Sequence, residues 1–335
     1  MNFPFCDPCC RAIRWVSLLL LLNAGVTVHA QTCLTEGDID AATSTALLNA
    51  AQNYFGMVAR GDAATLRQNA IAGVAADFSG IETAIKDNQS NFAGATPAPR
   101  SPYLLQAEGT ANLERAEFLC GVFGANGQTA NSAVFVIPNL APGNYGIVII
   151  DVTTPKGPYT VAFVLEKQAD AWKLGGLYIK PTQAAGHDGN WFAQHARDLK
   201  AKGKNESAWL YYLEARELLV PVSFMSTMVT DKLYDESQTV KPTDLPPTDL
   251  TAGGKTFKLT ALFPLAAGNE LDLVVKYESA SVANTTATYQ DNMAVMKAVL
   301  AKHPELRDVF DGMIARAVEP SGRDYGSILE MKNVN

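Results

Sequence analysis

Apolar and polar residues alternate most clearly over residues 159–181. The first half of this stretch has apolar side chains at every second position, at Tyr159, Val161, Phe163 and Leu165. After Gln168-Ala169-Asp170, the second half repeats the pattern with Trp172, Leu174, Gly176 and Tyr178. A period of two residues is typical of a half-buried strand. The pattern therefore predicts a β-hairpin that closes a curved sheet, with each apolar set on one face.

The first part of the chain before this hairpin has apolar residues at the spacing that is typical of helices. Apolar residues recur every three or four positions over residues 38–60, and Gly61-Asp62 ends the run. We expect a second helix over residues 63–75 and a Pro/Ala/Gly loop over residues 91–102. Further strands are expected at 117–123, 132–137 and 145–153, because short apolar runs there are separated by Gly, Asn and Pro.

The order of these elements resembles the NTF2-like (cystatin-like) superfamily over residues 31–182. The local resemblance lies in Tyr54-Phe55 on the first helix, Gly61-Asp62 at its end, and the stretch 172–179 on the last strand. The resemblance implies a helix-plus-curved antiparallel sheet and a possible homodimer formed through that sheet. This superfold hosts enzymes, binding proteins and dimerisation modules alike, so it does not decide the function.

Four aromatic residues are candidates for lining a ligand pocket inside this sheet: Tyr54, Phe55, Trp172 and Tyr178. Aromatic residues at helix and strand spacing also fill hydrophobic cores, and this alternative stays open. Some NTF2-like enzymes place an Asp/His pair inside the cone. The present chain has no histidine between Cys33 and Pro181, so that chemistry is not carried over.

Residues 183–237 are expected to form a pair of helices separated at Gly203. Their spacing of small and aromatic residues resembles one tetratricopeptide repeat, through Phe192, Ala196, Leu199, Gly203, Ala208, Tyr212 and Ala215. A single repeat does not bury its apolar faces alone. The alternative is an ordinary helical hairpin that packs on the preceding domain.

Residues 238–255 contain Pro242, Pro246 and Pro247 among Thr and Asp, which predicts a linker or a long surface loop. The remaining residues, 256–335, are expected to form a small C-terminal α+β domain. Strands are predicted at 256–263 and 270–278, followed by an amphipathic helix near Pro304 and closing strands at 313–318 and 327–334. The whole chain is therefore predicted to be α+β.

The first 30 residues have the layout of an export signal. Arg11 and Arg14 precede an apolar core of about a dozen residues, and Val28-His29-Ala30 offers small residues for cleavage after Ala30. The apolar core is shorter than the roughly 20 residues that span a bilayer. We expect a cleaved signal and a soluble periplasmic or secreted protein, with a retained membrane anchor as the alternative.

The mature chain would keep two of the five cysteines, Cys33 and Cys120. In an oxidising compartment they form a candidate disulfide that closes a loop of about 87 residues. Spacing alone does not establish proximity, so a buried free Cys120 is the competing interpretation.

The net charge and the sequence motifs argue against several classes of function. The net charge is −7 and basic residues do not cluster, which argues against binding nucleic acid or an anionic membrane. Common hydrolase motifs are absent, and Gly253-Gly254-Lys255-Thr256 is interpreted as a turn rather than a phosphate-binding loop. His187, His195 and His303 match no closed zinc pattern, so we predict neither a metal site nor a cofactor.

These observations favour an exported, non-catalytic protein that binds an unidentified small molecule or protein, or acts as a scaffold. The alternative is an exported NTF2-like hydrolase or isomerase that uses a carboxylate in the cone. A buried carboxylate with a shifted pKa behind the hairpin would separate the two hypotheses.

Overall fold

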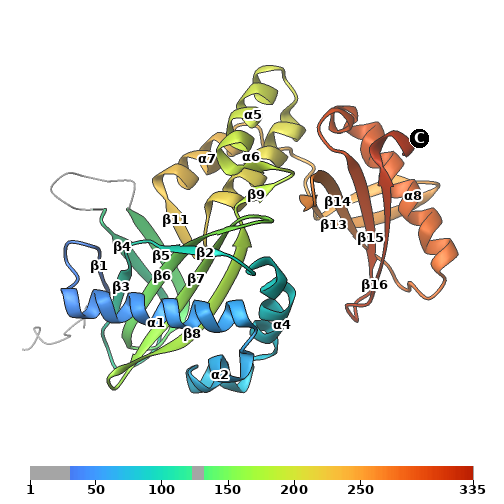
Figure 1. Ribbon diagram of the computed structural model, residues 1–335. Helices are drawn as coiled ribbons and strands as arrows, with labels where there is room; N and C mark the ends of the chain where they lie inside the picture. The colour runs from blue at the N-terminus through green and yellow to red at the C-terminus, as the bar shows by residue number, and fades with distance from the viewer. Residues whose placement is uncertain (1–30, 123–131, 335) are drawn as a thin grey trace, which may run out of the picture.

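The computed structural model describes residues 31–122 and 132–334 (Figure 1). The predicted export signal, residues 1–30, lies outside the described residues, as does Phe123 at the end of one predicted strand. Helices and mainly antiparallel strands both contribute to the structure, so the fold is α+β. None of the helices in these ranges is long and apolar enough to cross a membrane.

Four helices cover one face of the first sheet. They are α1 (Ala41–Arg60), α2 (Ala63–Gln68), α3 (Ala72–Ala76) and α4 (Ser79–Asn88), which continues into the 3-10 helix η1 (Gln89–Asn91). Helix α1 begins after Asp40, whose carboxylate accepts a hydrogen bond from the Thr43 backbone N–H at 2.9 Å. It ends at Gly61, where φ is +74°, a conformation that glycine adopts without strain.

The single helix predicted over residues 63–75 is divided into α2 and α3. At the division the backbone pairs with strand β8 (Ala171–Pro181): Leu174 N–H donates to Asn69 O at 3.0 Å, and Ile71 N–H donates to Leu174 O at 2.9 Å. Because these groups bond to a strand, the helical hydrogen-bond ladder is interrupted there.

The first sheet has the strand order β1-β3-β6-β7-β8, with β2 paired to β6. Its strands are β1 (Gln31–Leu34), β2 (Thr96–Pro99), β3 (Tyr103–Ala107), β6 (Gly143–Thr154), β7 (Gly157–Gln168) and β8. All pairs are antiparallel. In Figure 1, α1 lies across the front of this sheet.

The predicted hairpin is β7 and β8, but one part of its pattern is wrong. Trp172 and Tyr178 were expected on the same face. The register shifts between Val164 and Leu165, which pair with Gly176 and Leu174, so Gly175 is an extra residue on β8. A bulge of one residue reverses the alternation beyond it. Trp172 therefore faces the helices, whereas Tyr178 faces the opposite side.

A small second sheet covers that opposite side. Its order is β11-β5-β4, formed by β11 (Met225–Thr227), β5 (Ala133–Leu140) and β4 (Leu113–Cys120). A disulfide joins Cys33 on β1 to fully buried Cys120 on β4, with their Cα atoms 5.0 Å apart. The covalent link therefore connects the first strand of the large sheet to the small one, and apolar side chains fill both faces of the large sheet.

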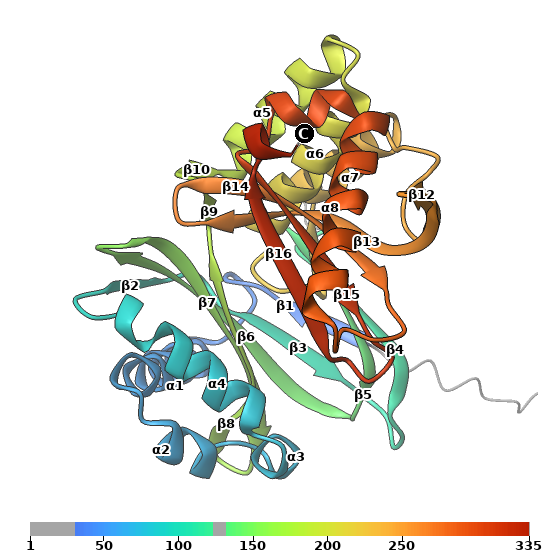
Figure 2. The same cartoon turned by 90° about the vertical axis from the view of Figure 1, so that its right-hand side faces the viewer.

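The C-terminal part is a five-stranded sheet with one helix packed on it (Figure 2). The strands follow sequence order: β12 (Thr248–Ala252), β13 (Lys255–Ala267), β14 (Glu270–Glu278), β15 (Gly312–Val318) and β16 (Asp324–Glu330). Strands β14 and β15 are parallel and are connected through α8 (Thr285–Lys302) and η2 (Pro304–Asp308). The 3-10 helix η3 (Met331–Asn333) follows β16.

The stretch predicted as a linker, residues 238–255, contains a strand. Residues of β12 pair with β13 through a two-residue turn at Gly253 and Gly254, whose φ angles are +57° and +75°. Two consecutive positive φ angles are typical of a type I′ hairpin turn, which glycine favours. The turn prediction for this glycine pair is confirmed, but the part of this stretch without helix or strand is limited to residues 239–247.

The helical pair shares its core with the C-terminal sheet. Helices α5 (Gly189–Ala201), α6 (Asn205–Leu219) and α7 (Met228–Gln238) follow the short strands β9 (Gln183–Ala184) and β10 (His187–Asp188). Apolar residues of α5 and α6 belong to the same hydrophobic cluster as those of β14 and α8. Tyr211 on α6 also donates a hydrogen bond to Val309 O at 2.8 Å.

One lysine connects the first sheet to the helical pair. Lys180, at the end of β8, donates to the backbone oxygens of Glu217 and Val220 at 2.7 and 3.0 Å. Its ammonium also lies 2.6 Å from the Glu217 carboxylate. These carbonyls are the open C-terminal end of α6, where a cation interacts favourably with the helix dipole.

Candidate functional site

Three of the four predicted pocket residues lie in one packed core. Tyr54, Phe55 and Trp172 belong to the cluster between the helices and the first sheet, and each is less than a tenth exposed. Tyr54 donates its hydroxyl hydrogen to Trp172 O at 2.7 Å. Phe55 packs edge-on against Phe92, with ring centroids 5.6 Å apart. The Tyr54 hydroxyl therefore has a protein partner, and the aromatic rings contact one another.

Tyr178 lies on the other face, where its ring packs edge-on against Phe224 at 5.4 Å. The structure brings the other three candidates together but separates Tyr178 from them. None of the four lines the cavities described below.

A cavity of about 410 Å³ lies where the three parts of the molecule meet, and we call it the junction pocket. One wall is the last two turns of α6, another is the segment that leads to β11, and the third is β13. Its lining residues are Leu213, Glu214, Arg216, Glu217, Val220, Ser223, Met225, Phe263 and Pro264. The walls are mostly apolar, and the ionisable side chains all come from α6.

Glu214 is the buried acid of the junction pocket. The residue is 8% exposed, and no hydrogen bond to its carboxylate is seen among the described residues. Burial raises the pKa of Glu214 to about 7, with a further contribution from Glu217, while Lys180 acts in the opposite direction. Partial loss of water disfavours the charged form of a carboxylate, and no described hydrogen-bond donor offsets that cost at Glu214.

Arg216 supplies an unmatched donor in the same pocket. Its Nε atom is buried and has no hydrogen-bond partner within the described chain. Its guanidinium lies over the ring of Tyr234, 4.9 Å from the centroid, which holds the side chain in place. The junction pocket is therefore lined by a largely buried carboxylic acid and by an arginine with one buried, unpaired N–H, beside apolar walls.

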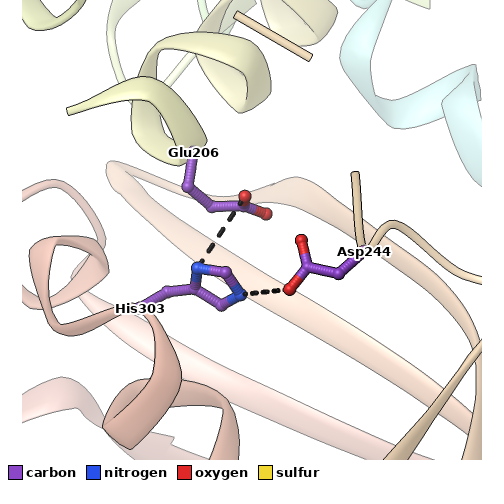
Figure 3. A group of neighbouring side chains, drawn as sticks. All are labelled: Glu206, Asp244 and His303. Atoms are coloured by element: carbon purple, nitrogen blue, oxygen red, sulfur yellow. Dashed lines mark ion pairs between the residues drawn. The ribbon is translucent and has the colours of Figure 1, made fainter. Parts of the chain in front are cut away.

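A second cluster of ionisable groups lies at the opposite end of α6 (Figure 3). His303 is placed between two acids: its Nδ1 lies 3.8 Å from Glu206 Oε2, and its Nε2 lies 3.5 Å from Asp244 Oδ2. Glu206 comes from the first turn of α6, Asp244 from the segment before β12, and His303 from the end of α8. Three distant segments of sequence thus converge on one imidazole.

The two acids of this cluster differ in environment. Glu206 is 5% exposed, and burial raises its pKa to about 7, with Asp244 and Glu305 adding to the effect. A hydrogen bond from Lys302 lowers the pKa of Asp244. The cluster therefore pairs one acid that is hard to ionise with one that ionises readily.

The other two histidines form a stack. The rings of His187 and His195 both lie parallel to the indole of Trp191, with centroids 3.7 and 3.6 Å away. His187 and Trp191 border a groove of about 460 Å³ between α5, α6 and the residues that follow α8. The stacking gives these histidines a packing role.

Both buried acids of α6 belong to one helical stripe. Glu206, Leu210, Glu214 and Leu218 are four residues apart, and each is buried. An acid at a core position of an amphipathic helix is a signal that the sequence contains, although the spacing does not show what the acid faces. Neither acid is among the residues predicted from the sequence, and His303 matched no closed zinc pattern there.

Comparisons of this chain with family models, with curated proteins and with solved structures gave no match.

Proposed function

We propose that the chain is an exported, non-catalytic binding protein whose ligand site is the junction pocket. The observation that carries the proposal is the pair of ionisable side chains in that pocket: Glu214, which is 8% exposed and has a raised pKa, and Arg216, whose buried Nε–H has no hydrogen-bond partner among the described residues. A few ionisable groups among apolar walls are typical of small-molecule sites, so this pair favours a ligand that supplies a donor for Glu214 and an acceptor for Arg216.

The pocket's chemistry defines the ligand class. Glu214 needs a donor, which an ammonium or amide N–H provides, and Arg216 needs an acceptor, which a carboxylate or carbonyl oxygen provides. Leu213, Met225 and Phe263 offer apolar surface beside them. A cavity of about 410 Å³ lies within the range of small-molecule sites. An apolar amino acid or a short apolar peptide meets all of these requirements.

The rest of the molecule would serve as the scaffold. We retain the NTF2-like arrangement for residues 31–182 and the tetratricopeptide-like pair for residues 183–237 as part of the proposal. Helices on one face of a curved sheet, and two close-packed helices after it, support them. Export is supported by the N-terminal signal pattern and by the Cys33–Cys120 disulfide, since disulfides persist mainly in oxidising compartments.

The rival hypothesis, an enzyme with a carboxylate in the cone, has less support. The buried carboxylates of the described residues are Glu206, Glu214 and Asp272, and all three lie outside residues 31–182. Tyr54, Phe163 and Trp172 occupy the space between the sheet and α1 instead. The proposal therefore places the ligand outside the first sheet.

Isothermal titration calorimetry with L-leucine, L-phenylalanine and the dipeptide Leu-Leu tests the proposal. We expect one of these probes to bind one-to-one, and Glu214→Gln to weaken that binding at least about tenfold, because it removes a charge-assisted hydrogen bond. Glu82→Gln, the same change at an exposed position on α4, is the matched control and should leave the affinity unchanged.

Equal affinity in the wild type and Glu214→Gln would contradict the assignment of the site. Continuous heat release with Leu-Leu, together with the appearance of free leucine, would instead support the enzymatic hypothesis.

A further inference from the structure

The cluster around His303 encloses a very small cavity. Glu206, Asp244, Lys302 and His303 line a space of about 20 Å³, whose other lining residues are Pro246, Thr248, Asp249, Leu250, Leu259, Leu262 and Val299. A cavity of this size holds one water molecule or one ion. The two acids and the imidazole are therefore arranged around a position for a single small species.

The separations between His303 and the two acids are too long for hydrogen bonds. The His303 nitrogens lie 3.5 and 3.8 Å from the nearest acid oxygens. No hydrogen bond to the Glu206 carboxylate is seen in the described part of the chain, although the residue is 5% exposed. A buried acid that lines a cavity without a donor points to a missing positive partner.

The donor atoms suit a metal ion. An ion takes one nitrogen of the imidazole, and one ligand atom from each of the three side chains lies within 4.8 Å of the other two. In a tetrahedral zinc site with bonds of about 2.0–2.2 Å, ligand atoms lie about 3.3–3.6 Å apart. The three side chains would thus need to close by roughly 1 Å, which rotation of Glu206 and of Asp244 can provide.

We propose that Glu206, Asp244 and His303 bind one divalent metal ion of the zinc class, with water completing the coordination. Imidazole nitrogen together with carboxylate oxygen favours zinc and its first-row neighbours over magnesium and calcium, which prefer oxygen alone. Such an ion would join the start of α6, the segment before β12 and the end of α8.

Lys302 acts as an internal competitor for this site. Its ammonium forms an ion pair with Asp244 Oδ2, the same oxygen that faces His303 Nε2. The lysine side chain is 44% exposed, so it can swing into solvent when an ion arrives. With Glu305 nearby, the two acids of the cluster provide enough negative charge for a dication even while Lys302 stays close.

Zinc titration of the mature protein, residues 31–335, at pH 7.5, followed by dialysis and metal analysis, tests the site. We expect one equivalent of zinc, affinity at least about tenfold lower in Glu206→Gln and in His303→Gln, and higher affinity in Lys302→Met, because the competing cation is gone. An excess of magnesium or calcium should not displace the zinc. Circular dichroism of each variant confirms that it is folded.

His195→Gln is the control, since it removes a histidine from the Trp191 stack and leaves the cluster intact. Absence of bound zinc in the wild type would overturn the proposal and assign the cavity to water. Zinc that persists in Glu206→Gln and His303→Gln but is lost in His195→Gln would overturn it as well. A Lys302→Met variant with weaker binding would contradict the competition.

Discussion

Glu214 makes the stability of the fold depend on pH in a defined direction. Its pKa is raised from 4.5 to about 7 in the folded protein. At pH values between these two pKa values, the Glu214 carboxyl keeps its proton in the folded protein but has released it in the unfolded chain. The free energy of unfolding therefore falls as the pH rises from about 4.5 to 7, and stays low above that window.

The size of this change in the free energy of unfolding follows from the shift in the pKa of Glu214. One pKa unit corresponds to about 1.36 kcal/mol, so a rise from 4.5 to about 7 amounts to on the order of 3 kcal/mol. Glu214→Gln keeps the shape of the protonated acid but does not titrate. We expect the variant to match the wild type near pH 4 and to be more stable than it above pH 7, by up to about 3 kcal/mol.

Urea unfolding of both proteins at pH 4, 5.5, 7 and 8 measures this difference. Other groups also titrate in the window, but they are common to both proteins and cancel when the two curves are subtracted. Glu82→Gln, the same change at an exposed position, controls for the effect of the substitution itself. A difference between Glu214→Gln and wild type that does not change with pH would refute the buried, unpartnered state of Glu214.

Other changes test how the parts are held together. Replacing both Cys33 and Cys120 by alanine removes a link across 87 residues, and we expect chemical denaturation to show a free energy of unfolding that is lower by up to about 4.6 kcal/mol. Two reactive thiols in the unreduced wild type would exclude the disulfide. Lys180→Met leaves the end of α6 without its cation, so we expect about 1–3 kcal/mol of lost stability in urea. Gly189→Ala would place a Cβ 2.8 Å from a backbone oxygen of α6, so we expect a lower melting temperature. Gly56→Ala in α1 meets only a flexible side chain, so we expect a higher melting temperature. The opposite order of melting temperatures would contradict the close packing of α5 on α6.

Local patterns in the sequence predicted most of the elements but not their irregularities. The hairpin at residues 159–181 follows from its alternation, and Gly61 marks the end of α1. The bulge at Gly175 was missed because one inserted residue changes the face of every later side chain and leaves no mark on composition. Tyr178 was therefore assigned to the wrong side of the sheet.

Long-range contacts account for the other differences. Cysteine spacing left a disulfide and a buried thiol equally open, and only the position of β1 beside β4 brings Cys33 to Cys120. Strand β12 lies in a stretch rich in Pro and Thr, and its pairing with β13 outweighs that composition. Glu206 stands out as an acid on a buried stripe, but the residues that it faces, Asp244 and His303, come from segments far away in the sequence.

Native mass spectrometry of the protein isolated from its source tests the binding proposal most directly. The account predicts a bound molecule with the mass of an apolar amino acid or short peptide, present in the wild type and absent from Glu214→Gln purified in the same way. A ligand-free wild type, or an adduct of equal abundance in both proteins, would contradict the assignment of the junction pocket as the binding site.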